Sequence, residues 1–149
     1  MPNIIARIAG LMLALAPAIA AAMFVVSFPW ARPAGKGGAT EVFMEMTSIE
    51  GAKLVGARSD VAVNAMLVGP GAKVKAAKSL TLPAGAPVVL APGSYRVRLS
   101  PVDRTLKLGD VVPLVIIIEA PDGSRQEIGV NAEVRVRSVV DDHLHAHRH

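Results

Sequence analysis

Cysteine is missing from this 149-residue chain, and aromatic residues are scarce. Without cysteine the chain has no disulfide, no thiolate metal site, no cysteine-linked haem and no cysteine nucleophile, so hydrophobic packing must hold the fold. Three Phe, one Trp and one Tyr give no stacking platform for single-stranded nucleic acid, and no clustered basic helix is indicated for a duplex. The net charge of +4 is mildly basic, and no nucleic-acid partner is expected.

Histidine is confined to the C-terminal segment HLHAHRH, residues 143–149, which holds all four histidines of the chain. No imidazole base can therefore lie in the core beside a serine, as nucleophilic catalysis usually requires. The carboxylates are scattered, and Glu41 and Glu45, which can share a strand face, are more typical of a solvated surface than of an acid/base pair. We therefore do not expect an enzyme.

Residues 1–22 are predicted to be a cleaved export signal. Arg7 supplies a short positive region, and the apolar run 8–22 ends in small residues that offer cleavage sites, Ala18, Ala20 and Ala22. The run is shorter than the ~20 apolar residues of a membrane span. The alternative is an uncleaved signal that anchors the chain, which would be its one contact with a membrane. The predicted protein is exported and periplasmic, with one domain over residues 23–138 and a disordered His-rich tail over residues 139–149.

The domain is predicted to be all-β, because short β-branched and apolar runs alternate with Gly, Pro, Asp and Ser punctuation and no sustained helical period appears. This spacing is typical of a β-sandwich or small barrel with Greek-key connections. A hairpin is expected at APDGS, residues 120–124, where Asp122-Gly123 can supply the positive φ of a tight turn. The strands are expected near Phe24–Phe28, Glu41–Ser48, Lys53–Ala57, Val61–Val68, Ser79–Leu82, Pro87–Leu90, Tyr95–Leu99, Val111–Glu119 and Gln126–Arg137.

Two of these strands make predictions about burial. The run VVPLVIIIE, residues 111–119, is almost continuously apolar and is expected between two layers. Pro113 predicts that the ladder starts after it or has an edge there. In EIGVNAEVRVR, residues 127–137, strict alternation predicts Val134 and Val136 on one face and the two arginines that follow them on the other.

Three methionines are candidate ligands for a soft metal: Met44, Met46 and Met66. Met44 and Met46 project from one face of a strand because side chains repeat every two residues. Thioethers suit Cu(I). The alternative is that methionine in a strand fills the core.

The stretch WARPAGKGGATEVFMEMTSIEGAKLVGARSDVA, residues 30–62, resembles the periplasmic copper chaperones of the PCu(A)C family. Those proteins begin with a strand ending in W-A-R-P, a Pro/Gly-rich loop, and a strand followed by a segment like LVGASSDVA. SLTLPAGAPVVLAPGSYRVRL, residues 79–99, and LKLGDVVPLVIIIE, residues 106–119, resemble later family motifs in the same order. The resemblance runs from Phe24 to about Val136 and implies a cupredoxin-like Greek-key β-barrel.

The chain departs from the family at the copper ligands that the resemblance implies. Family members bind Cu(I) through a His-x-Met-like pair after the SDVA segment, a further Met, and a His-x-Met after a Gly-Tyr turn. Here Asn64 stands where the first histidine is expected and Met66 is retained, while the middle methionine falls near residues 73–74. Arg96 and Arg98 occupy the last pair of positions. Arginine cannot deprotonate to ligate and repels a cation, so the barrel site is predicted to be lost or remodelled.

The tail offers the densest set of metal donors in the chain. Asp141 and Asp142 precede four imidazoles at alternate positions, which line one face if the tail is extended and can wrap one ion if it is flexible. Neutral imidazole binds Cu(II), Zn(II) or Ni(II). The alternative is a solvated terminus without a specific ligand. The predicted metal ligands are His143, His145, His147 and His149.

These observations predict a non-enzymatic, exported copper-binding or copper-delivery protein whose tail captures copper as Cu(I) or Cu(II). By resemblance its acceptor is an exported cuproprotein such as the CuA centre of cytochrome oxidase. A second hypothesis is a pseudo-chaperone without metal in its barrel, in which Arg96 and Arg98 bind an acidic partner surface. A third is a tail that buffers zinc or nickel without delivering it.

Overall fold

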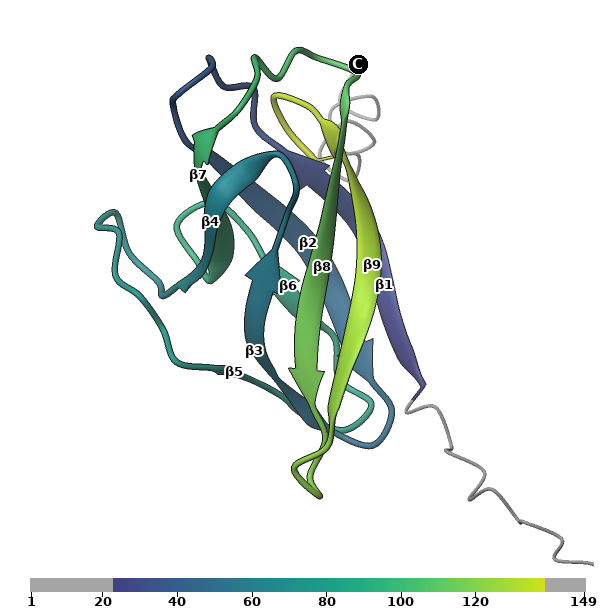
Figure 1. Cartoon of the computed structure of the whole chain (residues 1–149). Coiled ribbons are helices and arrows are strands. Elements are labelled where there is room, and N and C mark those ends of the chain that lie inside the picture. The colour runs from purple at the N-terminus through teal and green to yellow at the C-terminus, as the bar shows by residue number, and fades with distance from the viewer. Residues whose placement is uncertain (1–22, 139–149) are drawn as a thin grey trace, which may run out of the picture.

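The computed structural model describes residues 23–138, which form nine β-strands and no helix (Figure 1). Every predicted strand is present, and the all-β fold class is confirmed. Within this part of the chain no helix is long and apolar enough to cross a membrane. The strands are β1 (Phe24–Ala31), β2 (Thr40–Ser48), β3 (Ala52–Arg58), β4 (Ala62–Val68), β5 (Leu80–Leu82), β6 (Val88–Leu90), β7 (Arg96–Val102), β8 (Val111–Glu119) and β9 (Arg125–Val134).

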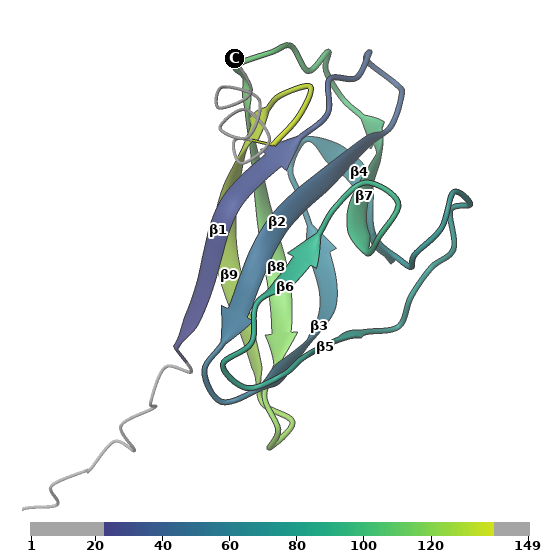
Figure 2. The same cartoon turned by 180° about the vertical axis from the view of Figure 1, so that it is seen from behind.

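The strands belong to one curled sheet in the order β4-β7-β2-β1-β9-β8-β3-β5, with β6 paired to β2 beyond the end of β7. The first strand therefore lies in the middle of the sheet. It pairs antiparallel with β2 and parallel with β9, through Trp30↔Glu133 and Ala31↔Val134. The sheet folds round on itself as a half-barrel, and Figure 2 shows β1, β2 and β6 on the side turned away in Figure 1.

The inner face of the sheet holds the main hydrophobic core. Alternation places every second residue of each strand there, and the core runs without a break through both halves of the sheet. On β2 it takes Val42, Met44 and Met46, and on β7 it takes Val97 and Leu99. Met44 and Met46 thus share a strand face, as expected, and that face is the core.

A second buried group lies on the outer face of the same sheet. We call Trp30, Phe43, Val68 and Arg96 the outer cluster, since each is buried while the first three lie outside the main core. The rings of Trp30 and Phe43 are 4.5 Å apart at their centroids, with an interplanar angle of 40°. Between Ser27 and Trp30 the pairing of β1 with β2 shifts by a β-bulge, which turns Trp30 toward the side of Phe43.

Strand β8 differs from the expectation that it lies between two layers. Its buried residues alternate, with Val112, Leu114, Ile116 and Ile118 inward, while Val111 and Pro113 are exposed. The reason is that every strand of the described residues belongs to the same sheet, so no second layer covers the outer face of β8. β3 pairs with β8 only from Val115 onward, so the first half of β8 has β9 alone as a neighbour. The edge predicted at Pro113 is confirmed.

Strand β9 also ends earlier than the alternation predicted. Val134 is buried, but Val136 is 69% exposed and does not share its face of the core. The parallel partner β1 ends at Ala31, whose carbonyl accepts a hydrogen bond from the Arg135 N–H at 2.8 Å. Beyond that bond the chain leaves the sheet, so the prediction for Val136 is wrong.

The hairpin predicted between β8 and β9 is confirmed. Gly123 has φ of 86°, and its N–H donates to the carbonyl of Ala120 at 2.9 Å. Oδ1 of Asp122 accepts hydrogen bonds from the hydroxyl and the N–H of Ser124, and these bonds lower the pKa of Asp122. The turn is therefore fixed by its own local chemistry.

Candidate functional site

Strands β4 and β7 bring together the positions where the family resemblance implied copper ligands. The two strands are antiparallel, with Asn64 opposite Ser100, Met66 opposite Arg98 and Val68 opposite Arg96. Directly opposed residues point to the same side of a sheet. That side is the outer face, because the neighbouring Leu67, Val97 and Leu99 lie in the core.

A turn tied to β8 sets the position of β4. The hydroxyl of Ser59 donates to the carbonyl of Pro113 at 2.6 Å and accepts a hydrogen bond from the N–H of Val61 at 3.3 Å. Pro113 lies in the half of β8 that β3 leaves uncovered, so its carbonyl is free for this bond. The SDVA segment therefore fixes the start of β4 and, through it, the place of Met66.

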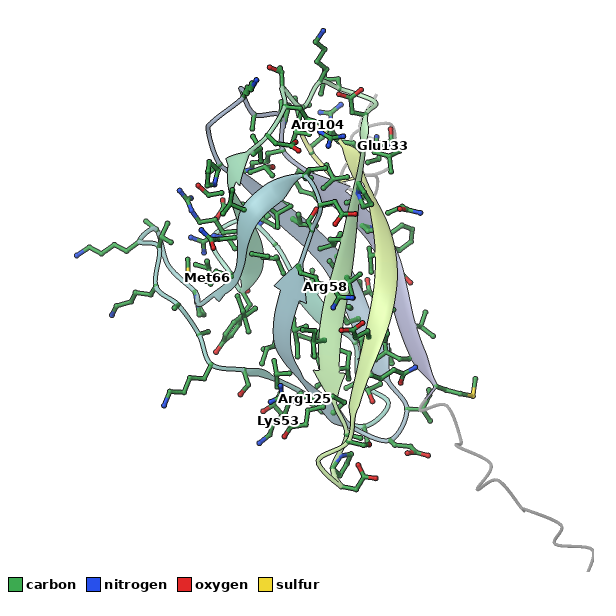
Figure 3. The ribbon with its side chains drawn as sticks, viewed as in Figure 1. Lys53, Arg58, Met66, Arg104, Arg125 and Glu133 are labelled. Atoms are coloured by element: carbon green, nitrogen blue, oxygen red, sulfur yellow. The ribbon has the colours of Figure 1, made fainter. Side chains whose placement is uncertain are left out.

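The loop after β4 returns along the outer edge of that strand. The N–H of Gly69 donates to the Lys75 carbonyl at 2.9 Å, and the N–H of Ala77 donates to the Leu67 carbonyl at 2.9 Å. Lys73, Lys75 and Lys78 are exposed along this loop. Figure 3 shows Met66 on this side of the molecule, well away from Arg58 on the front. Half-buried Met66 is thus bordered by a cationic loop.

Arg96 is a buried structural side chain, only 5% exposed. Its Nε donates to Oε2 of Glu41, and its Nη1 donates to the carbonyls of Gly69 and Ser94 at 3.1 Å and 2.9 Å. Arg96 therefore holds the loop of residues 69–78 and the turn before β7 against the outer face of the sheet. The predicted contact of Arg96 with a partner surface is corrected here, because its guanidinium has no accessible face to offer.

Glu41 is the partner that the sequence did not identify. It lies on β2 opposite Arg98, accepts the bond from Arg96, and its Oε1 lies 3.8 Å from Nη1 of Arg32. The guanidinium of Arg32 also lies over the ring of Phe43, 5.3 Å from its centroid. No sequence signal pairs Glu41 with Arg96, because the contact depends on β2 and β7 being neighbours.

Arg98 differs from Arg96 in having no such partners. It is half-buried between Met66 and Glu41, and within residues 23–138 no ion pair or side-chain hydrogen bond involves it. The β4–β7 face therefore offers one thioether beside a positive charge, which is unfavourable for a copper ion. In the described part of the chain no group of three or more His, Cys, Asp and Glu could hold a metal.

The remaining predicted ligands divide between the core and the tail. Met44 and Met46 are 2% and 0% exposed and pack in the main core. His143, His145, His147 and His149 lie outside the described residues. The last described residue, Ser138, lines a groove with Phe28, Trp30 and Val89, on the part of the outer face formed by β1, β2 and β6.

An exposed ion pair lies on a different part of the sheet, across β8. Nη2 of Arg58 lies 2.7 Å from Oε2 of Glu127, and the second guanidinium nitrogen bonds to the other oxygen. These hydrogen bonds lower the pKa of Glu127 and raise the pKa of Arg58. Both side chains are exposed, so the pair is a surface feature of the sheet and not part of the β4–β7 face.

Comparison with known proteins gives one family and several structural relatives. The model of the LpqE-like family, described as "Putative lipoprotein LpqE-like", matches residues 24–134. No curated protein matches the chain. The apo PCuAC domain from PmoF1 is similar in structure, with a TM-score of 0.64 and 19% identity over 76% of this chain and 94% of that one.

Two copper-containing structures are also similar. The copper-bound PCuAC domain from PmoF2 has a TM-score of 0.62 and 18% identity, over 76% of this chain and 93% of that one. The solution structure of CuI-DR1885 from Deinococcus radiodurans has a TM-score of 0.55 and 29% identity, over 78% and 83% of the two chains. The curled all-β sheet is therefore the cupredoxin-like fold of PCuAC domains.

Proposed function

The chain belongs to the LpqE-like family and has the PCuAC fold, and from this premise we propose that it is an exported, non-enzymatic copper-binding protein that acts as a copper chaperone. The proposal is supported by the Cu(I) form of the Deinococcus radiodurans protein, at 29% identity, and by the copper-bound domain of PmoF2. The family description as a lipoprotein supports export. These 149 residues contain no cysteine to carry a thiol-linked lipid, so we assign export to the predicted signal of residues 1–22.

The proposal that the tail captures copper rests on where the chain carries its potential metal-binding side chains. The barrel face that resembles the family's copper site has Arg98 beside its one thioether, Met66, whereas every imidazole of the chain lies in residues 143–149. We therefore assign copper capture to His143, His145, His147 and His149. Met66 is the donor that the barrel can add, while buried Met44 and Met46 fill the core.

Copper is the metal that this donor set favours. Imidazole binds Cu, Zn and Ni, but among divalent ions affinity is highest for Cu²⁺. A thioether adds preference for Cu(I). Zinc or nickel buffering by the tail remains the competing assignment, and competition between the three ions decides it. The acceptor that we propose is an exported cuproprotein, of which the CuA centre of cytochrome oxidase is an example.

A second function is favoured by one specific observation, the half-buried Arg98 without a counter-ion in the described residues. In this version the protein has lost metal exchange, and Arg98 with the exposed lysines of the loop 69–78 binds an acidic protein surface. Arg96 takes no part in it because it is buried.

Copper titration separates these functions. The exported protein is compared with a version that ends at Val140 and with a full-length variant in which the four histidines are replaced by asparagine. We expect specific copper binding in the native chain and its loss in both altered chains. Unchanged stoichiometry after truncation would overturn the tail as the site, and no specific binding in any form would favour the interaction module.

A further inference from the structure

The guanidinium of Arg98 can bind a carboxylate, and the described residues supply none to it. Its neighbour across β2, Glu41, has one oxygen engaged by Arg96 and the other facing Arg32. A partly buried guanidinium without a counter-ion is unfavourable, and an added carboxylate can bind it through two parallel hydrogen bonds. The anion must approach over the outer face, because Arg98 lies there beside Met66.

The chain leaves the described domain over this same face. Ser138 lines the groove formed by Phe28, Trp30 and Val89, and Trp30 packs on Phe43 in the outer cluster. Trp30 and Arg98 lie on β1 and β7, with β2 between them. Trp30 is opposite Phe43, and Arg98 is opposite Glu41, two residues away along β2. Two strand steps of about 4.8 Å and two residues of about 3.4 Å together give a separation of about 12 Å.

The next residues of the chain carry the missing charge at a suitable distance. Asp141 and Asp142 follow Ser138 by three and four positions. An extended chain spans roughly 3.3–3.6 Å per residue, so their Cα atoms lie within about 10 to 14 Å of Ser138. Val139 and Val140, which separate Ser138 from Asp141, are apolar. Apolar side chains suit a path along a groove lined by Phe28 and Trp30.

We propose that Asp141 and Asp142 dock on Arg98, so that the tail is latched across the outer face of β1, β2 and β7. The occupant of this face is thus the chain's own segment 139–142, and its recognition chemistry is a carboxylate pair on a guanidinium. The latch itself needs no metal. It makes Arg98 an anchor for the tail instead of a failed copper ligand.

The latch would bring tail imidazoles to the barrel's thioether, an effect that rests on the proposed copper function. Met66 lies directly opposite Arg98 on β4, and His143 follows the docked carboxylates immediately in sequence. Binding the aspartates also compensates the positive charge that would repel copper. Imidazoles and the Met66 sulfur could then bind one ion together.

A paramagnetic label tests the latch in copper-free protein, and the absence of native cysteine makes the labelling site unique. With a nitroxide attached to Leu144→Cys, we expect strong broadening of the Met66 methyl resonance. The methyl of Met23 should stay sharp, because Met23 lies just before β1, at the end of that strand far from Trp30. A sharp Met66 methyl would overturn the latch and leave Arg98 to an acidic partner.

Charge variants identify the contact. The double change Asp141→Asn with Asp142→Asn, or Arg98→Gln alone, should abolish the broadening, and Arg98→Lys should retain part of it. Glu50→Gln and Lys53→Gln, both on exposed side chains away from the β4–β7 face, serve as matched controls. Unchanged Met44 and Met46 resonances show that a variant is folded. Broadening of the Met66 methyl that persists without the two aspartates, or without the charge of Arg98, would contradict the proposed ion pair.

Copper affinity then distinguishes the latch from the proposed function. Replacing the two aspartates should weaken Cu(I) binding by about tenfold, equivalent to about 1.4 kcal/mol, while replacing the histidines abolishes it. Full copper affinity in the aspartate variant would overturn the composite site but leave tail capture intact. Broadening of Met66 in a chain that binds no copper would support the latch and refute the copper function.

Discussion

Arg96 and Arg98 lie two positions apart on the same face of β7, and their surroundings give them different roles. Arg96 contacts Glu41 and two loop carbonyls, so its charge is compensated within the domain. Arg98 has the thioether of Met66 on one side and an already engaged carboxylate on the other. The first arginine stabilises the fold, and the second is available for binding.

Removal of the Glu41 charge should destabilise the protein strongly. In Glu41→Gln the buried Arg96 loses its anion, and an uncompensated buried charge costs about 3 kcal/mol of unfolding free energy. Urea denaturation measures the change. Glu127→Gln is the matched control, because its pair with Arg58 is exposed and exposed pairs contribute little to stability. Equal effects of the two substitutions would contradict the structural role of Arg96.

The Arg58–Glu127 pair predicts a small pH dependence of stability. Hydrogen bonding from Arg58 lowers the pKa of Glu127 in the folded protein. The carboxylate therefore favours folding above its unfolded pKa of about 4.3, and this contribution is lost as pH falls through the lower folded pKa. Carboxyl NMR titration should show the low pKa, and Arg58→Gln should return it to the ordinary range. No change in that variant would mean that the pair does not form in solution.

At the scale of elements, the strands follow from sequence but their packing partners do not. Alternation and turn residues mark all nine strands, because burial of one face leaves a local period of two. The two-layer prediction for β8 failed because an apolar run does not reveal whether a second layer covers the outer face of the strand. The outer cluster was also missed, since it needs the bulge in β1 and the loop 69–78, both defined by contacts distant in sequence.

The β8–β9 turn provides a test at this scale. Gly123 has positive φ with open space around its Cα, so Gly123→Ala should cost about 1 kcal/mol from backbone strain alone. Gly129 in β9 also has open space but no positive φ, and Gly129→Ala should be neutral or stabilising. Thermal or urea unfolding of the two variants gives the comparison. A stabilising effect of Gly123→Ala would contradict the turn geometry.

For the whole molecule, the family resemblance pointed to one face of the sheet. It placed Asn64, Met66, Arg96 and Arg98 at ligand positions, and pairing of β4 with β7 brings these residues together. It could not separate the two arginines, because burial of Arg96 depends on Glu41 from another strand. It also could not relate the tail to the barrel. The proposed relation starts from Ser138, which lines the groove with Phe28, Trp30 and Val89.

Copper binding by the tail should depend on pH in a predictable direction. Imidazole ligates in its neutral form, so protons compete with the metal and affinity should fall as pH decreases through about 6.5. Titrations at several pH values measure this. A thioether does not titrate, so affinity that stayed constant from neutral pH to pH 5 would point to methionine ligands instead of the four histidines.

The parallel pairing of β1 with β9 fixes how the first and last strands are oriented in the domain. Because both strands run the same way, the start of β1 and the end of β9 lie at opposite ends of the domain (Figure 1). A domain tethered ahead of Phe24 would therefore turn the end of β9 away from the attachment. The proposed copper chaperone would then present that end to an acceptor that approaches from the open compartment.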